Sequence, residues 1–138
     1  MAQLKNLEIL PEGSHNVILK LATVGSIDLK TQASTNLFTV PTGKTLFVTD
    51  IIIRITTADT FSTPVSMEVG KTAGFDEWMA ATELTGLDTA EEFISLASLA
   101  NGSIRQTFAA AEVLALNITT GAGATTLTGE ATVFGFLI

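Results

Sequence analysis

The sequence contains no cysteine, one histidine and one tryptophan, and it has few charged residues. Without cysteine the chain has no disulfide and no thiolate ligand for zinc. One histidine is also too few for a metal site built from several imidazoles. The 138 residues suit a single domain, which buries enough apolar surface to fold without a cross-link or a metal ion.

Charged residues make up 15% of the chain, against about 25% in ordinary globular proteins. The net charge is −7 and the seven basic residues are scattered, whereas nucleic-acid binding needs clustered lysine and arginine. No apolar run approaches the roughly 20 residues of a membrane helix. We therefore expect neither a nucleic acid nor a membrane as partner. The excess apolar surface is expected in a subunit interface, the alternative being a surface coated with threonine.

Apolar and polar residues alternate along most of the chain, which predicts β-strands. The clearest strand, 45–57, is rich in β-branched residues and should place Phe47, Ile51, Ile53 and Ile55 on one face. It follows a turn predicted at Pro41-Thr42-Gly43-Lys44. Further strands are predicted at 16–21, 25–29, 36–40, 65–69, 104–108, 112–119 and 125–138. This pattern predicts an all-β fold, a single antiparallel β-sandwich of jelly-roll type over residues 15–138.

Residues 88–97 leave two interpretations open. Asp88 and Glu91 have the spacing of a helix capping box, whereas residues 92–96 also fit a short strand. Because the neighbouring segments are all predicted strands, the strand is the favoured interpretation.

Both ends of the chain are apolar. Residues 1–14 read as an N-terminal arm that ends in a break at 11–13, and the arm is expected either as an edge strand or lying across a neighbouring subunit. The C-terminus has no polar tail and should be buried in the sheet or in an interface. The expected interface residues are Leu4, Leu7, Ile9, Leu10, Phe136, Leu137 and Ile138.

No motif in the chain supplies a catalytic residue, a cofactor-binding site or a metal site. Two Gly-Lys-Thr triplets, at 43–45 and 70–72, lack the second glycine of a phosphate-binding loop. His15 is the single histidine that a Ser-His-Asp triad could use, but the sequence has no Gly-x-Ser-x-Gly nucleophile elbow. Adjacent acids such as Glu91 and Glu92 point apart on a strand and diverge on a helix, so they form no converging dyad. The chain is therefore predicted not to be an enzyme.

Phe75 and Trp78 lie in an acidic stretch and form a candidate contact loop. Aromatic rings in an exposed loop stack on sugars, which would make the chain a carbohydrate-binding module. Packing over the open end of the sandwich is the favoured alternative.

Three segments resemble small structural proteins of tailed bacteriophages. These are 37–53, a strand, turn and strand; 108–113, which reads FAAAEV; and 116–120, which precedes a glycine-rich turn and the apolar last strand. The resemblance covers about residues 36–138 and lies in the order of strands and turns.

Within that group the chain is most similar to capsid decoration (cement) proteins. The resemblance implies a homotrimer that binds the major capsid protein on the capsid exterior of the virion and stabilises the shell, without a cofactor. A head-fibre or tail-associated module is the alternative within phages. The sequence shows no signal-peptide pattern, so synthesis in the host cytoplasm without export is expected.

Overall fold

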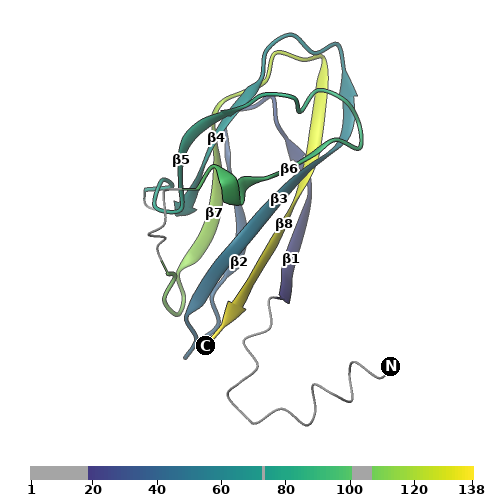
Figure 1. The fold of residues 1–138 in the computed structure, drawn as a ribbon. Helices are drawn as coiled ribbons and strands as arrows, with labels where there is room; N and C mark the ends of the chain where they lie inside the picture. Colours follow the sequence, from purple (N-terminus) through teal and green to yellow (C-terminus); the bar gives the residue numbers. More distant parts are fainter. Residues whose placement is uncertain (1–18, 73, 101–106) are drawn as a thin grey trace, which may run out of the picture.

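The computed structural model describes residues 19–72, 74–100 and 107–138, which form two antiparallel four-stranded sheets packed face to face (Figure 1). The first sheet has the order β1 (Leu19–Asp28), β8 (Thr126–Leu137), β3 (Leu46–Asp59) and β6 (Phe93–Ser95). The second has the order β2 (Ser34–Thr39), β7 (Val113–Thr120), β4 (Val65–Lys71) and β5 (Met79–Leu84). A 3-10 helix, η1 (Leu96–Ser98), follows β6. The predicted all-β sandwich is confirmed.

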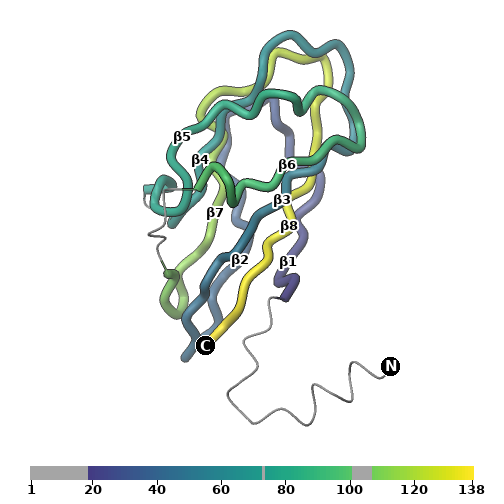
Figure 2. The backbone as a smooth tube through the Cα atoms, in the orientation of Figure 1, coloured from purple at the N-terminus to yellow at the C-terminus, as the bar shows by residue number. Residues whose placement is uncertain are grey.

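The strand order is that of a jelly roll. β1 pairs with β8, β2 with β7, β3 with β6 and β4 with β5, all antiparallel. The chain is thus a long hairpin of paired strands folded over on itself, which places alternate pairs in opposite sheets. The tube in Figure 2 can be followed from β1 through these pairs to β8. The predicted jelly-roll character is therefore confirmed.

The core lies between the two sheets and is built from the inward residues of the alternating strands. In β4, Val65, Met67 and Val69 are fully buried, and in β7 Leu114, Leu116 and Ile118 are buried. No polar or charged residue among those described is buried in this core. Burial of branched aliphatic side chains on both inner faces is the main stabilising contribution in such a sandwich.

The strand β3 contains a bulge that the sequence pattern did not reveal. Its pairing with β8 shifts between Val48 and Asp50, so the residues on either side of the bulge no longer follow one alternation. Leu46 and Val48 point inward before it, and Ile51, Ile53 and Ile55 point inward after it. Phe47, predicted to share the face of Ile51, lies on the outer face instead. That prediction was wrong because one extra residue reverses the side-chain direction.

Other local predictions had mixed outcomes. The turn predicted at 41–44 is present after β2: the Pro41 carbonyl accepts from the Lys44 amide at 3.2 Å, and Gly43 takes φ +73° at the third position. The favoured strand at 92–96 is confirmed as β6, and its chain then tightens into η1 rather than continuing. The strand expected at 25–29 is the second half of β1, beyond a bulge at Ser26, which has φ +58°.

Two predictions fall outside the described residues. The arm, residues 1–14, with Leu4, Leu7, Ile9 and Leu10, lies in the part of the chain before Leu19. Most of the strand expected at 104–108 also lies outside; its last residue, Phe108, is buried and forms an isolated bridge with Leu46. The boundary between arm and sandwich therefore stays a prediction.

Candidate assembly surface

The outer face of the β1-β8-β3-β6 sheet carries two chemically different halves. We call the side chains of these strands that point away from the core the outer face. Pairing across β3 and β8 places Phe47 opposite Phe136, Asp50 opposite Phe134, and Ile52 opposite Thr132. One row further on, Arg54 lies opposite Glu130. The first three rows form an apolar half and the following rows a polar half.

In the apolar half the rings of Phe47 and Phe136 stack, with centroids 5.0 Å apart and planes 7° apart. Phe134 and Ile52 continue the apolar surface on the neighbouring rows. All four side chains are half-buried. Aromatic residues concentrated on one sheet face are typical of the centre of a protein interface.

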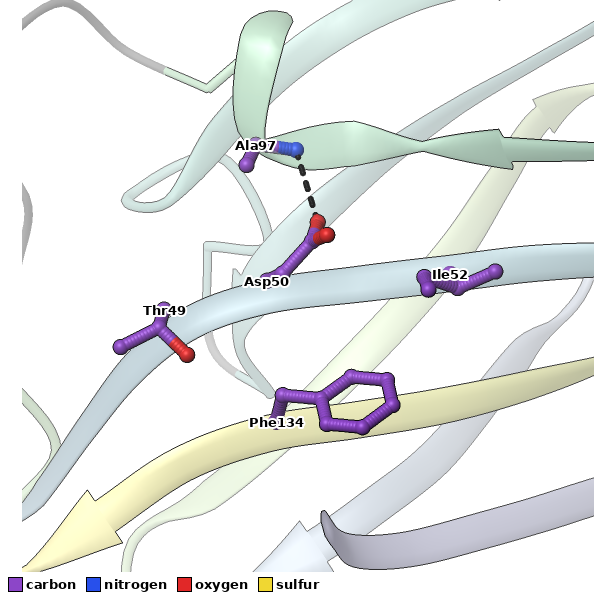
Figure 3. A pocket seen from close by; sticks show the side chains of 5 residues that line it. All are labelled: Thr49, Asp50, Ile52, Ala97 and Phe134. Carbon is purple, nitrogen blue, oxygen red and sulfur yellow. Dashed lines mark hydrogen bonds between the residues drawn. The ribbon is translucent and has the colours of Figure 1, made fainter. Parts of the chain in front are cut away.

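Next to the stacked pair the outer face has an open depression of about 410 Å³. Its lining is mainly apolar and comprises Thr49, Asp50, Ile52, Ala97 and Phe134. Figure 3 shows Ile52 and Phe134 on adjacent strands below the turn that carries Ala97. The Oγ1 atom of Thr49 is buried and has no hydrogen-bond partner among the described residues. The depression is thus open and mainly apolar, with the Asp50 carboxylate as the one charged group in its lining.

The carboxylate of Asp50 holds the rim of this depression. Its Oδ1 accepts from the amide of Ala97 at 3.1 Å (Figure 3) and from that of Ile51 at 2.8 Å. Both carboxylate oxygens accept from the Ser95 hydroxyl at 2.8 Å. The register of β3 with β6 would place residue 97 opposite Asp50, but there the chain has already turned into η1. The Asp50 carboxylate therefore holds the chain after β6 against β3 at the point where the backbone pairing of the two strands has ended.

The polar half is organised around Arg54. Its Nε donates to Glu130 at 3.0 Å and its Nη1 to Glu91 at 2.9 Å, and these hydrogen bonds, led by that to Glu130, raise the pKa of Arg54. Thr56 and Thr128 lie within hydrogen-bond distance on adjacent strands. Thr23 and Thr132 do the same in the last row of the apolar half. The polar side chains of this half thus have partners on the same outer face or in the turn before β6.

The three predicted C-terminal interface residues separate in the structure. Phe136 lies on the outer face, whereas Leu137 packs against the core. Ile138 is 55% exposed, and its backbone exchanges two hydrogen bonds with Thr45. Their role in an interface stays a prediction.

Sequence reasoning missed four outer-face residues. Phe47 was predicted to share the face of Ile51, and Phe134, Ile52 and the 67% exposed Phe93 were not singled out. The alternation of β8 alone could have placed Phe134 beside Phe136, since residues two apart share a face. The β3 residues depend on the bulge, which leaves no reliable mark in one sequence.

The two aromatic residues of the candidate contact loop do not form a platform. Trp78 is fully buried, directly before the buried Met79 at the start of β5. Phe75 is half-buried with φ +68°. The loop folds tightly over Gly70, where an added Cβ would lie 2.7 Å from the Phe75 carbonyl carbon. A buried indole is not available to stack on a sugar in this conformation.

The remaining chemistry-bearing groups of the described chain are dispersed. Within residues 19–72, 74–100 and 107–138, no three His, Asp or Glu side chains gather where they could hold a metal ion. In the same ranges, no helix has the length and apolarity to cross a membrane. Lys71, from the second Gly-Lys-Thr triplet, forms an ion pair with Glu112 at 2.8 Å. His15 lies outside the described residues.

Comparison with known proteins gives a likeness in structure and none in sequence. No family model matches the chain. No curated protein matches its sequence. A chain in the "Cyanophage Pam1 capsid asymmetric unit" superposes with a TM-score of 0.55 at 12% identity, covering 92% of this chain and 90% of that one. A chain in the "Acidic stable capsid structure of Helicobacter pylori bacteriophage KHP30" superposes with a TM-score of 0.51 at 12% identity, covering 88% and 95%.

These likenesses establish a shared fold. Because the superpositions cover about nine-tenths of both chains, the matched chains have nearly the same length as this one. The sandwich is therefore the whole of each matched chain rather than one domain of a larger one. At 12% identity the likeness transfers no individual residue.

Proposed function

We propose that this chain is a non-enzymatic structural protein of a bacteriophage virion, which decorates the exterior of the capsid as a homotrimer and stabilises the shell by binding the major capsid protein. The observation that carries the proposal is the match, over nearly full length, to chains in two phage capsid structures.

The physical properties of the described chain support this role. Two sheets closed over an entirely apolar core make a stiff block, as a component under mechanical load requires. The half-apolar outer face offers a surface for self-association. The net charge of −7 suits docking on a basic protein surface. No observation favours the carbohydrate-binding alternative, since Trp78 is buried.

The test is reconstitution on shells of the major capsid protein from the same phage, prepared without this chain. Added protein is expected to co-sediment with the shells at a saturating, fixed stoichiometry and to raise the temperature at which they disassemble. Protein that stays in the supernatant at every concentration and salt condition would refute the proposal.

Labelling the protein in intact virions separates decoration from the fibre and tail alternative. Decoration predicts label distributed over the whole head. Label at one vertex or along the tail would instead assign the chain to a fibre or tail module.

A further inference from the structure

The described chain begins beside the apolar half of the outer face. Leu19, the first described residue, pairs with Gly135 of β8, whose neighbours Phe134 and Phe136 both point to the outer face. The side chain of Leu19 is itself 54% exposed. Figures 1 and 2 show that β1 starts at the end of the sandwich where β8 finishes. Eighteen residues therefore precede a point next to the stacked rings.

The N-terminal arm carries apolar side chains that could cover the apolar half of the outer face. Leu4, Leu7, Ile9 and Leu10 are aliphatic and fall within seven positions, whereas the apolar half presents aromatic rings and an open apolar depression. Aliphatic side chains packed on aromatic rings bury large areas at an interface. Asp50, the acid at this end of the face, already accepts hydrogen bonds from two amides and one hydroxyl, which lowers the cost of covering its carboxylate with an apolar segment.

The length of the connection bears on which copy receives the arm. Eight residues lie between Leu10 and Leu19. An extended chain advances about 3.3–3.6 Å per residue, so the distance from Leu10 to Leu19 can reach roughly 30 Å. The four strands of the sheet are only about 15 Å across at 4.7–4.9 Å per spacing. The connection is thus long enough to reach a neighbouring molecule, and the choice of a second copy over the chain's own face follows from the homo-oligomer of the proposed function.

We infer that the apolar half of the outer face, built from Phe47, Ile52, Phe134 and Phe136, binds residues 4–10 of the N-terminal arm of a second copy. One aliphatic side chain of the arm fills the depression beside Ile52, and the others cover the stacked rings. Each copy donates one arm and receives one, a head-to-tail arrangement that closes into a ring. This inference rests on the homo-oligomeric part of the proposed function and names the contact that forms the oligomer.

The absence of cysteine makes a disulfide test clean. Two single-cysteine proteins, one Leu7→Cys and one Ile52→Cys, are mixed and mildly oxidised, and the linked peptides are identified by mass spectrometry. The control replaces Ile52→Cys by Thr56→Cys, four residues along the same strand in the polar half. A link between Leu7→Cys and Ile52→Cys at several times the yield of the control is expected.

Equal yields with the two acceptors would overturn the inference. A link that forms only within a chain carrying both substitutions would overturn it too, because the arm would then lie on its own sheet. Sedimentation supplies a second measurement. Deletion of residues 1–14, or Phe136→Ser, should shift the oligomer to monomer while circular dichroism shows a retained sandwich. A persisting oligomer in either folded variant contradicts the inference.

Shells are not needed for these measurements, so the outcomes are separable. Arm exchange with no shell binding would refute capsid decoration and leave this inference standing. Shell binding by a protein that shows no arm exchange would refute this inference and leave capsid decoration standing.

Discussion

The ring of Phe47 on β3 lies stacked on the ring of Phe136 on β8, with centroids 5.0 Å apart and an interplanar angle of 7°. The contact exists because the bulge between Val48 and Asp50 turns Phe47 outward, into register with Phe136. The backbone between the two strands is also tight here, since an added Cβ at Gly135 would lie 2.2 Å from the Phe47 carbonyl oxygen. A single irregularity in β3 thus creates the centre of the candidate assembly surface.

The stacked pair should show a measurable coupling energy. Phe47→Ala, Phe136→Ala and the double variant, compared by urea unfolding, should give a coupling of about 0.5–1.5 kcal/mol, the usual range for aromatic pairs. Phe47→Ala combined with Phe93→Ala is the control, because Phe93 lies on β6 without a ring contact among the described residues. These two changes should add to within about 0.5 kcal/mol. Strict additivity of the Phe47 and Phe136 effects would contradict the stacked geometry. The measurement is made at concentrations where the protein is monomeric.

Gly135→Ala should destabilise the sandwich. The new Cβ meets the Phe47 carbonyl oxygen and has no flexible side chain to displace, so β3 and β8 must move apart. The expected loss is about 1–3 kcal/mol in the free energy of unfolding, as for other overpacked sites. Gly25→Ala in β1 is the matched control, because nothing lies within 4 Å of its added Cβ. Its effect should stay within about 0.5 kcal/mol, and equal effects of the two changes would be inconsistent with the strand geometry.

Asp50→Ala should release η1 from the edge of β3. The carboxylate receives the Ser95 hydroxyl and the Ala97 amide, and hydrogen bonds to a charged group contribute about 1.5–3 kcal/mol. We expect a loss of that size in urea unfolding and faster hydrogen exchange at the Ala97 amide. Asp59→Ala is the control, since the exposed Asp59 side chain accepts from its neighbour Thr60. Unchanged exchange at Ala97 in the Asp50 variant would contradict the anchoring role.

The stability of the protein should fall in acid partly through Glu112. The hydrogen bond from Lys71, reinforced by the Ala109 amide, lowers the pKa of Glu112 below its ordinary value of 4.5. A lowered pKa means that the unfolded chain binds more protons in this range. The contribution of Glu112 is therefore fully present above pH 4.5 and is lost as the pH falls through the folded pKa.

The measurement compares the urea midpoint of wild type and Glu112→Gln between pH 7 and pH 3. The variant should be less stable at neutral pH, and its difference from wild type should shrink in acid. Asp28, whose pKa is lowered by the Lys30 amide and the Thr31 hydroxyl, should keep a similar acid dependence in both proteins. A difference that stays constant with pH would be evidence against the Lys71 contact.

Trp78 should behave as a core residue and Phe75 as a surface one. Trp78→Ala removes a fully buried indole and is expected to cost about 3–5 kcal/mol in the free energy of unfolding. Phe75→Ala, in the same loop but half-buried, should cost clearly less. If Trp78→Ala instead left stability unchanged and abolished binding on a glycan array, the buried placement would be wrong.

Much of the fold could be predicted because period-two patterns report burial directly. The strand β4 shows this, since Val65, Met67 and Val69 occupy every second position and all face the core. The prediction for β3 failed at Phe47 for the converse reason. A bulge changes the count of residues per face, and nothing in the composition around Val48 marks where it occurs.

The candidate site was predictable only in part. The apolar C-terminus pointed to Phe136, but its neighbour Leu137 packs inward. Phe47 and Phe136 are distant in sequence, and they meet only because β3 and β8 are neighbours in the sheet. For Trp78 the sequence left two interpretations open, stacking on a sugar and the favoured packing over the open end of the sandwich. The structure buries its side chain, and the loop before it approaches Gly70 closely.

The sequence by itself determined that this protein is a cysteine-free β-sandwich whose strands alternate apolar and polar residues. It also determined that the chain has fewer charged residues than an ordinary globular protein. These properties follow from composition and local periodicity, which act over a few residues. Only the tertiary structure decided the strand order and the position of the bulge. The apolar and polar halves of one outer face follow from these two features. The strand order and the bulge depend on pairing between residues far apart in the chain. The alternation of residues within one strand does not specify which strand will pair with it.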